Sequence, residues 1–191
     1  MVDVELLRVA VLIGSTRQGR FAPVVANWFA KYIQMREEFV IDMIDLAEMA
    51  LPDVLSRNQQ PAVEMLRGRL AVADAFVIIT PEYNHSFPAS LKTAIDWYSK
   101  EWQARPVAFV AYGGNAGGLR AVEQLRQVFA ELHAVTVRNA VGLAGVWELF
   151  DETGHLRNPA RHEKVASAML DQLAWWGQAL KEGRSLHPYP A

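Results

Sequence analysis

Apolar stretches of strand length alternate along the chain with segments in which apolar residues recur every three or four positions. The first apolar stretch ends at Gly14, and a helical pattern that includes Trp28, Phe29 and Ile33 follows it. Such an alternation of strands and amphipathic helices predicts an α/β fold with a parallel sheet. The predicted strands are residues 9–13, 39–44, 75–79, 107–112 and 135–137, and the predicted helices are residues 24–33, 62–72, 89–98, 119–132 and 161–181.

The polarity of the five strands indicates their order in the sheet. The first, third and fourth are almost continuously apolar, as expected when helices cover both faces of a strand. The second carries Asp42 and the short fifth carries Thr136, which suits positions at the sheet edges. The predicted order is therefore 2-1-3-4-5, a flavodoxin-like doubly wound sheet with its ligand site at the switch between strands one and three.

A length of 191 residues predicts one domain that spans residues 1–191. Residues 138–159 form a segment too long for an ordinary connection in a compact domain. The segment contains an apolar cluster with Trp147 and Phe150, followed by a predicted turn at 151–154. Two interpretations remain open, a loop packed on its own core and a lid or oligomer contact.

The composition excludes several classes of function. Lys and Arg number 19 and Asp and Glu 21, so a formal net charge of −2 offers no general attraction for nucleic acid or anionic lipid. The absence of cysteine excludes thiolate nucleophiles and cysteine-bound metals, and the five histidines show no metal-ligand spacing. Asp3 and Glu5 precede the first apolar stretch, unlike in a secretory signal, and no apolar run is long enough to span a membrane. We therefore expect a cytoplasmic protein without nucleic acid, metal or membrane as partner.

The loop after the first predicted strand has the composition of an anion site. Backbone N–H groups at a helix N-terminus, two hydroxyls and two guanidinium groups would lie together there. The loop lacks the Walker A motif and the dinucleotide fingerprint, so the prediction is a monophosphate group. The alternative is that Ser15 or Thr16 caps the following helix and that the arginines are merely solvated. The candidate residues are Gly14, Ser15, Thr16, Arg17, Gly19 and Arg20.

The loops after the third and fourth strands suit a planar heterocycle. Both would meet the first loop, because the carboxyl ends of neighbouring parallel strands share one edge of a sheet. The loop after the third strand offers an aromatic ring and hydrogen-bonding groups. The loop after the fourth strand offers glycines that let a flat ligand edge approach the backbone. The alternative for this last loop is that it is only a flexible turn. His85 is interpreted as satisfying a local hydrogen bond rather than as a proton donor. The candidate residues are Pro81, Glu82, Tyr83, Asn84, Ser86, Gly113, Gly114, Asn115, Gly117 and Gly118.

These motifs resemble the NAD(P)H-dependent FMN reductases, a family that includes flavodoxin-like quinone and azo-compound reductases. The resemblance is carried by Gly14-Ser-x-Arg17, by Pro81-Glu-Tyr-Asn84 with Pro88-Ala-x-Leu-Lys-x-Ala-Ile-Asp-Trp97, and by Gly113-Gly-x-x-Gly-Gly118. It implies that the FMN phosphate binds Ser15, Arg17 and the loop through Arg20. It also implies that residues 81–84 lie along the isoalloxazine, with Tyr83 beside the ring, and that residues 113–118 hold the pyrimidine edge. Many relatives have serine in place of Arg20.

The resemblance implies an oxidoreductase that forms a homodimer or a higher homo-oligomer, with FMN as cofactor and NADPH or NADH as co-substrate. Hydride would pass from NAD(P)H through FMN to a quinone-like or other small acceptor in a ping-pong cycle, with no obligatory catalytic side chain. Two alternatives remain open, a flavodoxin-like electron carrier without NAD(P)H turnover and a flavin-free domain that binds a phosphate ligand or a protein partner. The sequence assigns neither the physiological acceptor nor the preference between NADPH and NADH.

Overall fold

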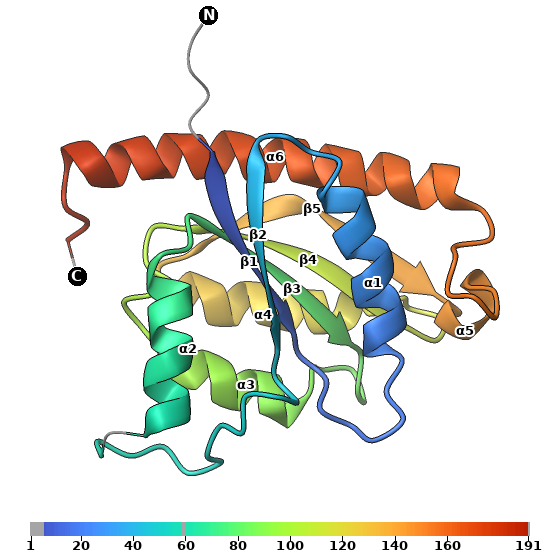
Figure 1. The fold of residues 1–191 in the computed structure, drawn as a ribbon, viewed down its shortest axis with the longest axis horizontal. Coiled ribbons are helices and arrows are strands. Elements are labelled where there is room, and N and C mark those ends of the chain that lie inside the picture. The colour runs from blue at the N-terminus through green and yellow to red at the C-terminus, as the bar shows by residue number, and fades with distance from the viewer. Residues whose placement is uncertain (1–5, 59, 191) are drawn as a thin grey trace, which may run out of the picture.

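Five parallel strands form one sheet in the order β2-β1-β3-β4-β5 (Figure 1). The computed structural model describes residues 6–58 and 60–190. The order confirms the flavodoxin-like doubly wound fold predicted from strand polarity. The strands are β1 (Leu7–Ile13), β2 (Phe39–Asp45), β3 (Ala75–Pro81), β4 (Pro106–Gly113) and β5 (Val135–Ala144).

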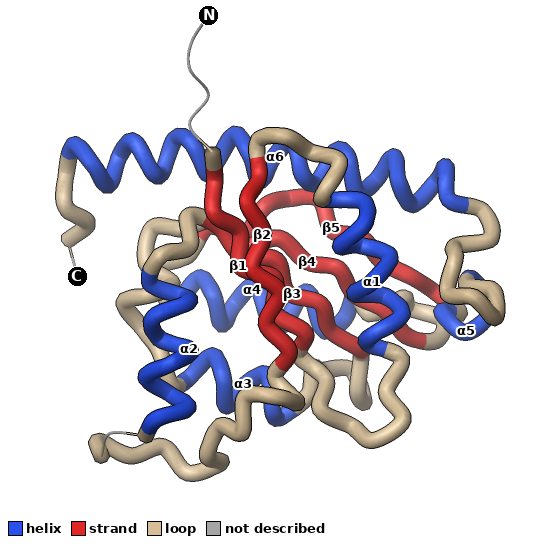
Figure 2. Tube along the Cα trace, in the orientation of Figure 1, coloured by secondary structure: helices blue, strands red, loops and turns tan. Residues whose placement is uncertain are grey.

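Helices cover both faces of the sheet, as Figure 2 shows. One apolar core lies between the sheet and the helices α1 and α6, and a second lies between the opposite face and α2, α3 and α4. The short α5 joins the first of these cores. The helices are α1 (Ala22–Ile33), α2 (Pro61–Ala71), α3 (Ala89–Asp96), α4 (Leu119–Glu131), α5 (Val146–Leu149) and α6 (Pro159–Leu186).

Strand β3 shows why a central strand reads as a continuous apolar run. All its residues are buried, and successive side chains point to opposite faces of the sheet. Val77 therefore packs in the core under α1 and α6, whereas Phe76 and Ile78 pack in the core under α2, α3 and α4. A polar residue at any of these positions would be buried without water, which explains the absence of alternation.

The edge strand β5 is longer than predicted, because it runs to Ala144 rather than ending near residue 137. A shift of register between Val107 and Phe109 of β4 marks a bulge in the β4–β5 pairing. Arg138 and Asn139 lie in the bulge, and these polar residues interrupt the apolar pattern on which the prediction relied. The side chain of Arg126 donates to the carbonyl oxygens of residues 137 and 138 at 2.7 and 2.9 Å, which satisfies acceptors that the bulge leaves unpaired.

The long connection predicted at residues 138–159 consists partly of β5 and partly of α5, which the sequence pattern did not predict. Phe150 and Leu156 form an isolated antiparallel bridge, and both side chains belong to the core under α1 and α6. The segment therefore packs on a main core rather than on a core of its own. Helix α6 is also longer at both ends than the predicted 161–181.

Candidate functional site

The three predicted loops meet at one edge of the sheet, beyond the carboxyl ends of β1, β3 and β4 (Figure 1). They enclose a cavity of about 430 Å³, within the usual range for small-molecule sites. The convergence expected from the strand order is thus present in the structure. The cavity is lined by Ser15, Arg17, Gly19, Arg20, Phe21, Pro81, Glu82, Tyr83, Tyr112, Gly113, Gly114 and Trp147.

The first loop holds a buried hydroxyl and an exposed cation. Ser15 is fully buried, and its Oγ lies 2.9 Å from the hydroxyl of Tyr83, which joins the first loop to the second. Arg17 is exposed, and its side chain forms no hydrogen bond or ion pair with any residue that the structure describes. The N-cap of α1 is Phe21, without a side-chain cap, so the alternative that Ser15 or Thr16 caps this helix is wrong.

Arg20 has a different role from Arg17, because Asp45 already holds its guanidinium group. Two nitrogens of Arg20 donate to the two carboxylate oxygens of Asp45 at 2.5 and 2.6 Å, and one of them also donates to the carbonyl oxygen of Ser15 at 2.6 Å. The hydrogen bond and charge of Asp45 raise the pKa of Arg20. Both side chains are mostly buried, at 16% and 17% exposed. The pair fixes the loop backbone and leaves Arg17 as its free cation.

The second loop contains a tight turn from Tyr83 to Ser86. The backbone groups of these two residues exchange hydrogen bonds of 2.8 and 2.9 Å, while Asn84 and His85 both have positive φ, at 49° and 68°. Gln124 of α4 fastens the turn, since it accepts from the Ser86 hydroxyl at 2.6 Å and donates to the His85 carbonyl oxygen at 2.7 Å. The ring of His85 is exposed and has no partner among the described residues, so its expected local hydrogen bond is absent.

The glycines of the third loop divide into two pairs. Gly113 and Gly114 line the cavity, and a Cβ atom at Gly114 would meet nothing within 4 Å. Gly117 and Gly118 have φ values of 60° and 85°, and a Cβ atom at Gly118 would lie 2.5 Å from the backbone nitrogen of Tyr112. The second pair therefore allows α4 to start close against β4 and β5, which is a requirement of packing rather than of a ligand.

Two buried polar atoms of cavity-lining residues lack hydrogen-bond partners among the residues that the structure describes. The hydroxyl of Tyr112 is buried without a hydrogen bond, and burial raises its pKa, so it remains a neutral donor. One carboxylate oxygen of Glu82 accepts from Arg120 at 3.0 Å, but the other is buried and unpaired. Unpaired buried groups are costly, and in a binding cavity they are candidates for ligand contacts.

The structure separates the predicted site residues into two sets. Gly14, Thr16, Asn84, Ser86, Asn115, Gly117 and Gly118 do not line the cavity, whereas the other predicted residues do. Three lining residues were not among the candidates, namely Phe21, Tyr112 and Trp147. A tyrosine at the end of an otherwise apolar strand is a usable signal for Tyr112. The apolar cluster around Trp147 was visible in the sequence, but its place in the fold was not.

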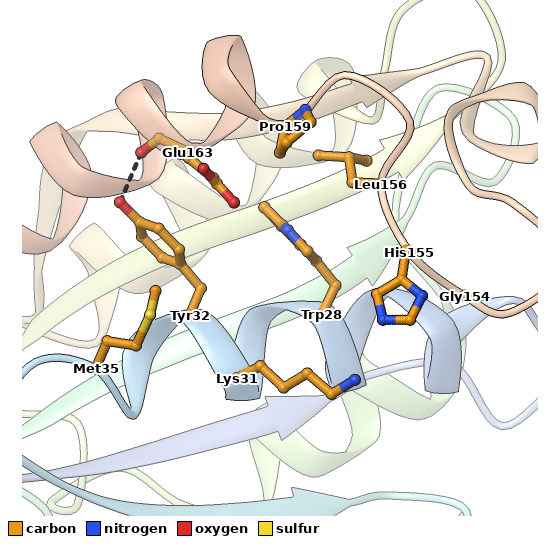
Figure 3. A pocket seen from close by; sticks show the side chains of 9 residues that line it. All are labelled: Trp28, Lys31, Tyr32, Met35, Gly154, His155, Leu156, Pro159 and Glu163. Atoms are coloured by element: carbon orange, nitrogen blue, oxygen red, sulfur yellow. Dashed lines mark hydrogen bonds between the residues drawn. The ribbon is translucent and has the colours of Figure 1, made fainter.

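A second cavity, of about 240 Å³, lies between α1 and residues 154–163 (Figure 3). The rings of Trp28 and Tyr32 stack at 6.4 Å in its wall, and the Tyr32 hydroxyl donates to the carbonyl oxygen of Glu163 at 2.9 Å. It shares no lining residue with the first cavity and has no glycine-rich loop. It therefore does not match the predicted site for a flat anionic ligand.

Within residues 6–58 and 60–190, no group of three or more His, Asp or Glu side chains is arranged to hold a metal ion. In the same part of the chain, no helix is both long and apolar enough to cross a membrane.

Comparison with known proteins identifies relatives over most of the chain. The family model described as NADPH-dependent FMN reductase matches residues 7–148. The NAD(P)H-dependent FMN reductase of Schizosaccharomyces pombe is 31% identical over 63% of this chain and 64% of its own length. A quinone reductase of Escherichia coli is 35% identical over 88% of this chain and 90% of its own length. The flavoenzyme NAD(P)H:acceptor oxidoreductase of Paracoccus denitrificans has the same fold, with a TM-score of 0.75 and 21% identity over 91% of this chain and 98% of its own.

The pair of Arg20 and Asp45 yields a stability prediction. Asp45→Asn leaves a mostly buried guanidinium without its counter-charge, so we expect the free energy of unfolding to fall by about 1–2 kcal/mol. Asp96→Asn is the matched control, because it breaks the more exposed helical pair with Lys92 and should cost less than about 0.5 kcal/mol. Urea unfolding of both variants measures the difference. Equal small losses would mean that Asp45 does not brace the loop.

The division of the glycines yields a second prediction. Gly118→Ala places a Cβ atom against the backbone of β4 at a positive φ, so it should lower the free energy of unfolding by more than about 2 kcal/mol. Gly114→Ala meets open space without a positive φ, so it should change the free energy of unfolding by less than about 1 kcal/mol. Thermal and urea unfolding of the two variants test this contrast. A stable Gly118→Ala protein would contradict the packing role assigned to this glycine.

Proposed function

Because the chain belongs to the family of NADPH-dependent FMN reductases, we propose that the cavity between its three loops is the place where FMN binds. The protein is an oxidoreductase that uses FMN as cofactor and NAD(P)H as co-substrate. FMN, when bound, supplies the hydride and electron chemistry. The chain's own residues then have to bind and orient the flavin, and the observation that carries the assignment is the meeting of three predicted loops around one cavity.

The residues present fit the two chemical ends of FMN. Arg17 supplies an unpaired guanidinium for a phosphate, and the hydroxyl of Ser15 lies in the same loop. Elsewhere in the lining, the Tyr112 hydroxyl and one Glu82 oxygen are a buried donor and a buried acceptor without partners. A flavin carries hydrogen-bond donors and acceptors on its ribityl chain and its ring, so it can supply a partner for the Tyr112 hydroxyl and for the Glu82 oxygen. Gly114 leaves open space in which a flat edge can approach the backbone.

We assign the ring to the second and third loops. Tyr83 is held beside Ser15 and at the start of a braced turn, which supports its assignment as a neighbour of the isoalloxazine. The backbone of Gly113 and Gly114 supports a role at the pyrimidine edge, where amide dipoles would stabilise negative charge. No protein side chain is assigned as an obligatory proton donor. In particular, His85 lies in the exposed turn and does not line the cavity.

The proposed reaction is hydride transfer from NAD(P)H and electron transfer to a quinone-like or other small acceptor, in ping-pong order. The name of the Escherichia coli relative, a quinone reductase, supports this acceptor class. Both substrates would use the same cavity in turn, since the three loops meet around it. An electron carrier without NAD(P)H turnover is the competing hypothesis.

The proposal also includes a homodimer and a cytoplasmic location. Val54 and Leu55 before α2, and Met65 on α2, are large apolar side chains exposed to solvent. Exposed apolar side chains that form one contiguous patch are typical of surfaces that pair with another protein chain. They support, together with the resemblance stated above, a contact between two copies on this side of the molecule.

Arg17→Ala tests the phosphate assignment. Loss of a charged hydrogen bond should weaken FMN binding by about 1.5–3 kcal/mol, measured by titration of the apoprotein with FMN. Arg161→Ala is the control, because Arg161 is also exposed and has no ion pair among the described residues, yet it lies in α6 outside the cavity. Unchanged FMN affinity in Arg17→Ala would remove the phosphate role from this residue.

Turnover distinguishes the enzyme from the electron carrier. The FMN-loaded protein should oxidise NADPH or NADH continuously when a water-soluble quinone is present. Initial rates at several quinone concentrations should give parallel double-reciprocal lines, the pattern expected when both substrates use one site in turn. A protein that retains FMN but oxidises neither nucleotide would be a carrier.

A further inference from the structure

Trp147 is a large apolar side chain that the fold presents to solvent beside the proposed flavin cavity. Its side chain is 66% exposed, although it lines the cavity. The residues around it are not loose, since Val146 is fully buried and Phe150 is only 4% exposed. An exposed indole on a well-packed segment forgoes the stabilisation that burial would give, which points to a ligand contact.

Hydrogen bonds tie the position of Trp147 to the third loop of the cavity. Gly145 caps α5 with a φ of 60°, and its N–H donates to the carbonyl oxygen of Gly114 at 3.0 Å. The N–H of Glu148 closes the turn by donating to the Gly145 carbonyl oxygen at 2.9 Å. Trp147 lies between these two residues and is therefore held next to the loop proposed to carry the ring of the flavin.

The chain provides a second exposed tryptophan for comparison. Trp175 on α6 is 65% exposed, but its ring contacts Trp176 edge to face at 4.9 Å, and it does not line the flavin cavity. Trp147 forms no ring contact with another aromatic side chain in the described part of the structure. No aromatic ring of the described residues therefore stacks on Trp147, which is exposed and lines the cavity.

We propose that Trp147 is a wall of the flavin site that packs against the isoalloxazine ring system. The inference rests on the proposed function. An indole offers a broad apolar face and one N–H donor, so it suits a flat heteroaromatic ring better than a phosphate, which Arg17 can bind. Trp147 therefore contributes affinity for the ring, whereas Arg17 contributes affinity for the phosphate. The two residues divide recognition of FMN between its ends.

Riboflavin, which has the same ring and ribityl chain without the phosphate, separates the two contributions. The apoproteins are titrated with FMN and with riboflavin, and the dissociation constants are compared. Trp147→Ala should weaken both by a similar factor of roughly ten or more, the scale of stacking on an aromatic side chain. Trp147→Phe keeps an aromatic ring, so its affinity for both flavins should fall much less than that of Trp147→Ala. Arg17→Ala should weaken FMN alone, and Trp175→Ala should change neither constant.

Each result decides between specific interpretations. The inference is overturned if Trp147→Ala leaves both dissociation constants unchanged. It is also overturned if the variant binds only FMN more weakly, because that result would place the indole at the phosphate. Equal weakening in Trp147→Phe and Trp147→Ala would show that the aromatic face is not what binds. A changed oligomeric state in Trp147→Ala, with flavin affinity retained, would make the residue a contact between chains. Failure of the folded wild-type protein to bind either flavin would instead overturn the proposed function itself.

Discussion

The burial of β3 between two helical layers is the constraint on which the rest of the molecule depends. A strand covered on both faces is mostly apolar, and a buried polar side chain in it needs a partner, as Thr80 has in the carbonyl oxygen of Pro81 at 3.0 Å. Its parallel neighbours have to be joined by helical crossovers. The carboxyl ends of all the strands then lie at the same edge of the sheet. At this edge, backbone hydrogen bonds also join the first residues after one strand to the neighbouring strand. The N–H of Gly14 donates to the carbonyl oxygen of Ile79 at 2.8 Å, and that of Glu82 donates to the carbonyl oxygen of Tyr112 at 3.0 Å. The loops are thus fastened to one another where the cavity begins.

At this edge of the sheet, residues of the same type have different structural roles, and the groups around each residue determine its role. Arg17 and Arg20 are three positions apart, but the carboxylate of Asp45 holds only the second, so one guanidinium builds the loop and the other is free to meet an anion. The glycines divide in the same way. Gly118 lets a helix approach a strand, whereas Gly114 leaves room in front of the backbone. A motif therefore mixes residues that build the loops with residues that line the cavity.

This mixture also explains how far the sequence could predict the structure. Asp42 and Thr136 were enough to place their strands at the edges, because edge strands tolerate polar side chains better than central ones, and the flavodoxin-like order satisfies this placement. The end of β5 was missed, since the bulge at Arg138 and Asn139 breaks the apolar pattern without ending the strand. The pairing of Asp45 with Arg20 depends on two strand ends being neighbours, which local pattern alone does not contain. The sequence shows that Trp147 is apolar. Whether its side chain packs in the core or lines a cavity depends on where that side chain points in the fold, which the local pattern does not contain.

The cavity has little acid–base chemistry of its own, and this follows from how its ionisable groups are held. Burial keeps Tyr112 neutral, and Arg120 partly balances the carboxylate of Glu82. Asp45 offsets the charge of Arg20, so among the groups described above only Arg17 presents a charge without a counter-ion. A site of this kind binds an anionic end strongly and leaves the flat end to shape and stacking. Such recognition orients a cofactor but discriminates weakly between small acceptors, because one apolar contact more or less changes binding by only about 1–3 kcal/mol.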